Sequence, residues 1–477
     1  MDQNLKRIFI KGGVITPNEL KKIINLSKAL NLKYIHFGSR QDILLRVKDE
    51  QKNLLETYFP EFKLDIVHDH EHHNIISSYV SSDIFQQTPW LSSSTYLYLH
   101  EAFKHSPKLK VNITDPLQRL IPLFNGHINF IASKNEDYWY VNLNLPGWEK
   151  DIYYPVLVYT WNIPKIAQVI EEQYKNCKNV DDLFAKVTEQ TDSNNQVIKE
   201  PLSIKFKPFP YYEGMNQMGL NQYWLGLYWR NNKYDIDFLE DLCDFLMDYG
   251  VSRICITPWK SFIVKGIDSK YKFLFEKFLG QRGINVRHSS LELNWHLPVN
   301  DTKALDLKRF IVKSFDLNDI STYGLTIGYH ERSKDPKYFT SMVIEKNPQP
   351  TILNQFENID TYNLLYCKNF DPNSKEYITY ASNIEQLELP GLLMKLSQMY
   401  FEQLDFNLEN VAKPTNKNLA NNNKTVHQCK SCLTVYDQTL GDITANIQPG
   451  TLFSELPQDY ECSLCESPKA DFTEVTL

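Results

Sequence analysis

The spacing of apolar residues predicts two amphipathic helices in separate parts of the chain. The apolar face of the first consists of Leu20, Ile23, Ile24 and Leu30, and that of the second of Leu239, Leu242, Cys243, Phe245 and Leu246. Thr16-Pro17-Asn18-Glu19 precedes the first helix and predicts a capping box, with Thr16 as N-cap and Glu19 at the third helical position. Asp235 and Asp237 begin the second helix in a comparable way.

Two short strands are predicted after each helix. They are Tyr34–Phe37 and Ile43–Val47 after the first, and Arg253–Thr257 and Phe262–Val264 after the second. A further helical stretch follows each pair, at residues 54–59 and 273–278. The two sets are offset by 219 residues throughout, as the pairs Thr16 and Asp235 or Tyr34 and Arg253 show. The same elements in the same order at one offset indicate an internal duplication.

The segments after each copy also correspond and predict a second sheet in each half. These strands are Lys108–Ile113, Ile128–Ile131 and Trp139–Leu143 in the first half, and Arg309–Lys313, Leu325–Ile327 and Tyr338–Ile344 in the second. Helices over residues 164–178 and 390–404 would close the two halves.

Short motifs in this duplicated frame resemble the siroheme-dependent nitrite and sulfite reductases. Ser39-Arg40-Gln41 stands where that family has Thr-Arg-Gln, and Pro107-Lys108-Leu109-Lys110 resembles its Arg-Lys-Phe-Lys. Thr257–Lys260 is similar to the corresponding turn of the second copy, and His73-Asn74-Ile75 falls at an Arg-Asn-Val or Arg-Asn-Ile position. The resemblance covers about residues 5–405. It implies an α+β fold in which two ferredoxin-like half domains pair and two α/β domains carry siroheme.

The resemblance also implies a set of cofactor-binding residues, namely Arg40, Lys108, Lys110 and Lys260. Siroheme carries several carboxylates and the substrates of that family are anions, so a shared pocket requires arginine and lysine in fixed positions. An arginine in a turn and alternating lysines on a strand are also typical of a solvated surface. Both interpretations stay open at this stage.

The cysteines of this region depart from the family. The reductases hold an iron–sulfur cluster with four cysteines in two tight groups, and one thiolate bridges to the siroheme iron. Here the region has only Cys177, Cys243, Cys255 and Cys367, and none is close to another in sequence. Cys243 and Cys255 fall on predicted core faces, where free cysteine behaves as a small apolar residue. We therefore expect no [4Fe–4S] cluster and no thiolate bridge to siroheme.

Four further cysteines lie near the C-terminus in two Cys-x-x-Cys pairs. Cys429 and Cys432 form the first pair, and Cys462 and Cys465 form the second after 29 intervening residues. Two such pairs can surround one metal ion as a tetrahedron of thiolates, which selects zinc or iron. Two unrelated pairs of reduced thiols are the alternative.

The residues around these pairs resemble rubredoxin, the one-iron electron carrier. They include Pro449-Gly450, Leu456-Pro457 and the aromatic residues Tyr436, Phe453, Tyr460 and Phe472. The resemblance implies a mononuclear iron held by the four cysteines. Leu433 and Glu466 stand where rubredoxins usually have glycine, and Ser463 where the second pair usually has proline. A leucine at positive φ would be strained, so these positions depart from the family pattern.

Two polar segments lie between the predicted domains. Residues 407–424 contain seven asparagines and predict a flexible tether. The run His68-Asp69-His70-Glu71-His72-His73 could bind a transition metal, although a solvated loop is the simpler interpretation.

The charge is unevenly distributed along the chain. Residues 425–477 carry eight Asp or Glu and two Lys, whereas the whole chain has a net charge of −7. An acidic C-terminal domain suggests docking on a basic patch, either in the body or on a redox partner protein, or serves solubility alone. No basic stripe indicates nucleic acid, and no eighteen-residue apolar run indicates a membrane span. The N-terminus does not read as a signal peptide, and we expect a cytoplasmic protein.

Six segments are therefore predicted. They are a first ferredoxin-like half domain (1–70), a first siroheme-reductase-like domain (71–200), a second half domain (201–295), a second reductase-like domain (296–405), a linker (406–426) and a rubredoxin domain (427–477).

Three functions fit these segments. The first is an electron-transfer protein with a rubredoxin-type iron tethered to a nitrite/sulfite-reductase-like body, with siroheme and a small inorganic anion as candidate ligands. The second is an active reductase in which that iron replaces the iron–sulfur cluster. The third is a non-catalytic scaffold with structural zinc.

Overall fold

The computed structural model describes residues 5–51, 64–66, 75–149, 151–192, 194–333, 337–348, 360–409, 425–438, 440–442, 444–445 and 447–476. The chain divides into two compact units, a body of residues 1–403 and a smaller unit of residues 404–477. The predicted helix over residues 54–59 and the run His68–His73 lie outside the described residues.

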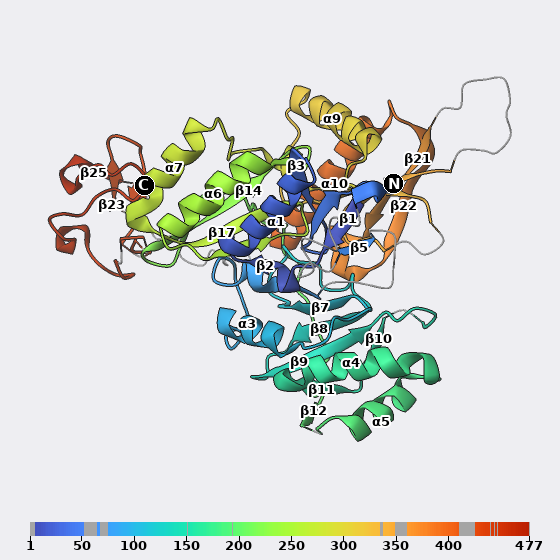
Figure 1. Ribbon diagram of the computed structural model, residues 1–477. Helices are drawn as coiled ribbons and strands as arrows, with labels where there is room; N and C mark the ends of the chain where they lie inside the picture. The colour runs from blue at the N-terminus through green and yellow to red at the C-terminus, as the bar shows by residue number, and fades with distance from the viewer. Residues whose placement is uncertain are drawn as a thin grey trace, which may run out of the picture. The chain divides into compact units, whose positions relative to one another are not determined.

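Two five-stranded sheets form the part of the body that contains both predicted copies (Figure 1). The first has the order β15-β3-β4-β1-β5, with β15 Tyr234–Asp235, β3 Tyr34–Phe37, β4 Ile43–Arg46, β1 Leu5–Ile8 and β5 Leu64–Ile66. The second has the order β13-β14-β17-β16-β2, with β13 Gly214–Met218, β14 Gln222–Tyr228, β17 Ser261–Asp268, β16 Arg253–Ile256 and β2 Val14–Ile15.

The two sheets exchange their end strands. β2 comes from the first half of the chain and pairs with β16 of the second, whereas β15 comes from the second half and pairs with β3 of the first. Each of these short strands leads directly into the amphipathic helix of its own half, α1 (Pro17–Ala29) or α6 (Ile236–Asp248). The halves are therefore joined by backbone hydrogen bonds as well as by side chains.

The helices α1 and α6 lie side by side and share one hydrophobic core (Figure 1). The predicted capping box is present, since the side chains and backbone of Thr16 and Glu19 bond reciprocally. The side chain of Asp235 accepts a hydrogen bond from the backbone N–H of Phe238 at the corresponding end of α6. At the rim of the helix pair, Lys21 Nζ lies 2.6 Å from Asp244 Oδ1.

Two mixed sheets, one of seven strands and one of five, complete the described part of the body. One has the order β12-β11-β9-β8-β7-β6, with β12 Asn195–Val197, β11 Val156–Tyr159, β9 Tyr138–Leu143, β8 Ile128–Ala132, β7 Val111–Thr114 and β6 Ile75–Ser77, and β10 (Ile152–Tyr153) pairs with β9. The other has the order β18-β19-β20-β21-β22, with β18 Trp295–His296, β19 Ile327–Glu331, β20 Met342–Lys346, β21 Thr361–Cys367 and β22 Tyr377–Glu385.

These two sheets repeat one pattern of strand directions. β6, β7 and β8 are mutually parallel and β9 is antiparallel to β8. In the same way, β18, β19 and β20 are parallel and β21 is antiparallel to β20. One long α-helix separates the first two parallel strands in each half, α3 (Ser93–Ala102) in the first and α9 (Thr302–Leu317) in the second.

The helix α9 corrects the strand predicted over Arg309–Lys313, which was wrong. Ala304, Leu307, Ile311 and Phe315 are buried at helical spacing, and Asp301 caps the helix by accepting from the backbone N–H of Ala304. The wrong prediction considered five residues only, whereas the apolar period is visible over sixteen.

The remaining helices in the described part of the chain are α4 (Ile163–Gln173), α5 (Val180–Gln190), α7 (Lys272–Gln281), the one-turn α8 (Ser290–Leu293) and α10 (Leu389–Glu409). Short 3-10 segments connect the elements at Lys11–Gly13, Asp49–Gln51, Ser78–Ser81, Thr160–Asn162, Tyr174–Asn176, Ser269–Tyr271, Lys368–Phe370 and Pro372–Ser374. The helix α10 extends to Glu409, so the first residues of the predicted linker are helical. In the part of the chain that is described, no helix is both long and apolar enough to span a membrane.

The smaller unit contains a three-stranded sheet of order β24-β23-β25, with β24 Val435–Tyr436, β23 Thr425–Cys429 and β25 Phe472–Thr476. Short 3-10 segments lie at Phe453–Glu455 and Lys469–Asp471. Its buried core consists of Cys429, Tyr436, Leu456, Tyr460, Cys462 and Phe472. Because so small a core excludes little apolar surface from water, a domain of this size depends on a covalent or metal link.

Candidate metal centre and body cavity

The four cysteines of the smaller unit converge on one point. The sulfur atoms of Cys429, Cys432, Cys462 and Cys465 all lie within 4.8 Å of one another. The Sγ distances are 3.6 Å between Cys429 and Cys465 and 3.5 Å between Cys432 and Cys462. A tetrahedral metal with bonds of about 2.3 Å to sulfur requires sulfur separations of about 3.8 Å, so this set fits a single ion.

The two Cys-x-x-Cys turns have the same backbone geometry. The N–H of Leu433 donates to the carbonyl of Cys429, and the N–H of Glu466 donates to the carbonyl of Cys462. Leu433 has φ 62° and Glu466 has φ 60°. The positions where the family usually has glycine therefore keep the left-handed conformation here, although a side chain costs about 1–2 kcal/mol there.

A hydroxyl group lies beside one sulfur in each turn. The Oγ1 of Thr434 lies 3.1 Å from the Sγ of Cys432, and the Oγ of Ser467 lies 3.2 Å from the Sγ of Cys465. Sequence reasoning missed both residues. The signal that could have found them is a hydroxyl residue two positions after the second cysteine of each pair.

The surroundings shift the thiol pKa values in different directions. The Thr434 hydroxyl, with the backbone N–H of the same residue, lowers the pKa of Cys432 to about 6. Backbone N–H groups, that of Cys432 first, also lower the pKa of Cys429. Burial raises the pKa of Cys462 to about 11. The surroundings thus favour the thiolate forms of Cys432 and Cys429, whereas the buried Cys462 requires a metal ion to stabilise its charged form.

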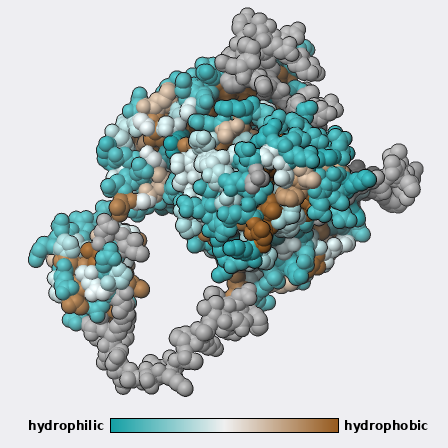
Figure 2. Space-filling view, turned by 90° about the horizontal axis from the view of Figure 1, so that it is seen from below, coloured by the Kyte–Doolittle hydropathy of each residue, from teal (hydrophilic) through white to brown (hydrophobic). Residues whose placement is uncertain are grey.

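Aromatic side chains pack around the sulfur cluster as the resemblance implied. Tyr436, Tyr460 and Phe472 are buried, and the rings of His427 and Phe453 stack at 4.0 Å. The hydroxyl of Tyr460 donates to Asp442 over 2.9 Å. Large apolar side chains that stay exposed on this unit include Leu433, Val435, Leu440, Leu452 and Leu464. Brown apolar residues are visible on its largely hydrophilic surface in Figure 2.

The cysteines of the body have a different environment. Cys243, Cys255 and Cys367 are buried in separate elements, α6, β16 and β21. Burial raises the pKa of Cys243 to about 12 and that of Cys255 to about 11. Among the described residues, a group of metal-ligating side chains this tight occurs only at the four C-terminal cysteines.

The predicted Arg40 is buried and links two sheets. Its Nη1 donates to Asn112 Oδ1 over 2.7 Å, and its Nη2 donates to the carbonyl of Val111 over 3.0 Å. Asn112 in turn donates to Asn125 Oδ1 over 2.7 Å. Burial, partly offset by Asp42, lowers the pKa of the Arg40 guanidinium.

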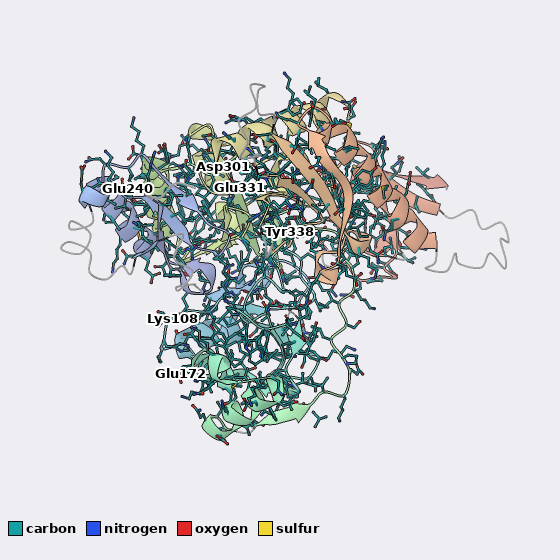
Figure 3. All side chains as sticks on the ribbon, turned by 90° about the vertical axis from the view of Figure 1, so that its right-hand side faces the viewer. Lys108, Glu172, Glu240, Asp301, Glu331 and Tyr338 are labelled. Atoms are coloured by element: carbon teal, nitrogen blue, oxygen red, sulfur yellow. The ribbon has the colours of Figure 1, made fainter. Side chains whose placement is uncertain are left out.

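Lys110 lies close to Arg40, whereas Lys108 does not share its environment. Burial and the nearby charges of Arg40 and Lys337 lower the pKa of Lys110 to about 7. Lys108 is exposed at the surface of the lobe that contains β7 (Figure 3). The strand predicted over Lys108–Ile113 begins only at Val111, so the two lysines are in the preceding turn rather than on one strand face.

Lys260 is buried in another part of the body. Burial and the charge of Lys308 lower the pKa of Lys260 to about 7, and the charge of Lys260 contributes to the lowered pKa of His296. Gln41 has φ 57° and Lys260, which is 219 residues later, has φ 58°. The two residues thus occupy equivalent turn positions of the duplicated copies.

The body contains a cavity of about 340 Å³ that none of the four predicted residues lines. Cationic side chains in its wall are Arg119, Lys207, Lys337 and Lys375, and aromatic ones include Phe124, Trp148 and Trp259. Among the described residues that line this wall, Asp151 is the one acidic side chain, and it pairs with Lys375. Tyr338, also in the wall, lies near the middle of the body in Figure 3.

Arg40 and Lys110 do not line the cavity, but hydrogen bonds connect both of them to side chains that do. Asn125, which receives the hydrogen bond from Asn112, lines the cavity. His127 also lines it, and its Nδ1 accepts from the backbone N–H of Lys110 over 3.1 Å. Sequence reasoning missed the cationic wall because its four residues come from distant segments of the chain.

Comparison with known proteins identifies the smaller unit. The rubredoxin family pattern matches residues 426–472. Over 45 residues, this region is 47% identical to the probable rubredoxin HupI of Bradyrhizobium diazoefficiens and 42% identical to rubredoxin-1 of Chlorobaculum tepidum, in each case 9% of this chain and 65% of the relative. It is 45% identical to the probable rubredoxin HupJ of Rhodobacter capsulatus over 47 residues, which is 10% of this chain and 17% of that protein. The chain thus spans less than two thirds of the length of these relatives.

The body is similar to a solved structure. The NirA protein of Mycobacterium tuberculosis superimposes with a TM-score of 0.60 and 11% sequence identity, over 83% of this chain and 81% of that one. At this identity the likeness shows the fold. The chain therefore consists of a C-terminal rubredoxin domain, residues 426–472, and a body with the mixed α+β fold of NirA.

Proposed function

We propose that this protein transfers single electrons through its rubredoxin domain to or from its NirA-like body or a partner of that body. The observation that carries the proposal is the convergence of four cysteine sulfurs within 4.8 Å inside a rubredoxin frame. An iron ion held by these thiolates supplies one-electron transfer when bound. The chain's own residues hold the thiolates at the required spacing and cover the two inner ones, Cys429 and Cys462, from water.

Two features favour iron over zinc and hence electron transfer over a structural role. The aromatic packing of Tyr436, Phe453, Tyr460 and Phe472 follows the rubredoxin pattern. Cys465 is exposed, which leaves one ligand at the surface where an electron can leave or enter. A purely structural site has no need of an exposed ligand, because exposure admits competing water and oxidants.

The test is metal analysis of protein produced with excess iron and purified without oxygen. We expect one iron per chain and a visible spectrum that bleaches on reduction. Retention of zinc under these conditions would contradict the electron-transfer proposal and favour the scaffold.

For the body we propose an anionic ligand of the tetrapyrrole class, with siroheme as the candidate. The supporting observation is the cavity with four cations, one acid and aromatic walls, backed by Arg40 and Lys110. Carboxylates would be held by Arg119, Lys207 and Lys337, and the aromatic side chains suit a flat ring system. The duplicated sheets would then be the two ferredoxin-like half domains and the two siroheme-reductase-like domains, with boundaries near residues 70, 200, 295 and 405.

Siroheme titration of the full chain tests this second part. We expect saturable binding by the wild type, at least tenfold weaker binding by Arg119→Ala, and little change for Lys108→Ala, whose side chain is exposed. Absence of binding by the wild type would leave the body without this cofactor. Weaker siroheme binding by the alanine variants of Lys108 or Lys260 would assign that residue to the binding site.

We further propose that the acidic rubredoxin domain docks on a basic redox partner in the cytoplasm. Its residues 425–477 have eight acidic and two basic side chains, which favours association with a positive surface. Reduction of the rubredoxin domain by a partner should then slow markedly as the ionic strength rises.

A further inference from the structure

We infer that Thr434 and Ser467 set the reduction potential of the metal centre through hydrogen bonds from their hydroxyl groups to the outer cysteine sulfurs. This inference rests on the proposed function in one respect, that iron can occupy the four-cysteine site. The role of the two hydroxyls goes beyond the four ligands and concerns residues that touch sulfur without binding the metal.

The geometry makes the two contacts equivalent. Each hydroxyl residue follows the second cysteine of its pair by two positions, and its carbonyl accepts a hydrogen bond from the N–H of the first cysteine. Cys429 N–H donates to Thr434, and Cys462 N–H donates to Ser467, both over 2.8 Å. This closed turn holds the hydroxyl oxygens 3.1 Å and 3.2 Å from the sulfurs of Cys432 and Cys465.

In the structure the Cys432 thiol donates to the Thr434 hydroxyl, whereas either group could be the donor between Cys465 and Ser467. Metal binding would fix the direction of both hydrogen bonds. A metal-bound cysteine is a thiolate and has no proton to donate. The hydroxyl must therefore donate to sulfur. Within the part of the chain that is described, neither hydroxyl group forms a hydrogen bond with any other side chain. Sulfur is therefore the one side-chain partner seen for each hydroxyl there.

Donation to sulfur favours the reduced site. The iron centre gains one negative charge on reduction, and a donor that stabilises negative charge on sulfur binds the reduced form more strongly. The two contacts differ in exposure, because Cys432 is half-buried whereas Cys465 is exposed. Water competes for the exposed sulfur, so Thr434 should have the larger effect.

The experiment uses the full chain reconstituted with ferrous iron, and measures the midpoint potential by spectroelectrochemistry. Removing the Thr434 hydroxyl with the isosteric Thr434→Val should lower the equilibrium constant for reduction about tenfold, or roughly 59 mV. Ser467→Ala should lower it by a smaller factor, about threefold. The double variant should show both decreases together.

Two controls separate the hydroxyls from packing. Thr434→Ser keeps a donor at the same place and should keep the potential close to that of the wild type. Thr473→Val removes a hydroxyl that contacts the carbonyl of Gln428 over 3.4 Å and should leave the potential unchanged. Equal potentials for wild type, Thr434→Val and Ser467→Ala would overturn the inference, as would an equal decrease for Thr434→Ser and Thr434→Val.

Reconstitution with iron keeps this result separate from the proposed function. Zinc in the protein as isolated would count against electron transfer in the cell, but the hydroxyl effect would still be measured on the iron-loaded chain. If Thr434→Val fails to retain iron, Ser467→Ala provides the decisive measurement, because Ser467 lies at the more exposed end of the site.

Discussion

The rubredoxin domain and the body achieve stability in opposite ways. The domain has a buried core of six residues, two of which are cysteines that face the metal centre. The body has large buried clusters, and one of them combines α1 and α6 with strands from both halves of the chain. A domain with so small a core depends on a bound metal ion for its stability. The duplicated body is stabilised instead by apolar surface that its two copies bury against each other.

Removal of one cysteine ligand should have the largest effect, and it should destabilise the rubredoxin domain alone. Cys432→Ala removes one of four ligands, and we expect loss of bound iron and unfolding of residues 425–476, because ligand binding and folding are coupled in so small a domain. Hydrogen exchange should show fast-exchanging amides in that unit and unchanged protection in β14 and β17. Retained protection around Tyr436 and Tyr460 would show that the aromatic core suffices without metal.

Truncation of a buried aromatic side chain in the body should have the next largest effect, on the stability of the body. Phe262 is fully buried, and its ring contacts Phe37 of the other half at 5.5 Å between centroids. Phe262→Ala should lower the free energy of unfolding of the body by about 3–5 kcal/mol. Thermal unfolding by circular dichroism measures this change, and the visible spectrum of the iron-loaded domain serves as the internal control. Bleaching of that spectrum at the same temperature would show that the two units unfold together.

The stability of the body should depend on pH through the buried side chain of Lys260. Burial lowers the pKa of Lys260 to about 7, whereas an unfolded lysine has a pKa of about 10.4. Between these values the unfolded state binds more protons, so the contribution of Lys260 to stability rises with pH, by at most about 1.4 kcal/mol per pH unit. Lys260→Met should reduce this rise between pH 7 and 9.

Denaturant unfolding of wild type and Lys260→Met at several pH values checks that expectation. The difference between the two proteins removes the contribution of cysteine and tyrosine residues that titrate in the same range. Parallel stability curves would mean that Lys260 stays charged and solvated in the folded state.

The smallest expected effect compares the two copies directly. Thr16 caps α1 and Asp235 caps α6 at equivalent positions. Replacing either residue with alanine should cost about 1 kcal/mol, because each removes a side-chain acceptor from the first turn of its helix. Equal losses in thermal unfolding would indicate that the copies contribute equally to one cooperative unit, and a much smaller loss at one site would indicate independent fraying of that helix.

Local patterns in the sequence predicted much of the fold correctly. The helices that begin at Pro17 and Ile236, the strands that follow them and the convergence of the four C-terminal cysteines were all evident from periodicity, capping and spacing. The helix α9 was mistaken for a strand because a short apolar run does not distinguish the two periods. The exchange of β2 and β15 could not be predicted, since strands of two residues carry almost no pattern.

The four candidate metal ligands could be predicted from residue spacing, because each Cys-x-x-Cys pair brings two sulfurs together through a local turn. Only the tertiary structure decided which other groups meet. Thr434 reaches the sulfur of Cys432 through a local turn, yet its significance depends on the thiolate cluster that the distant Cys462 and Cys465 complete. In the body, Arg119, Lys207, Lys337 and Lys375 form one cavity wall although they span more than half of the chain. Contacts between distant segments depend on how sheets and helices pack, and residue spacing contains no record of that packing.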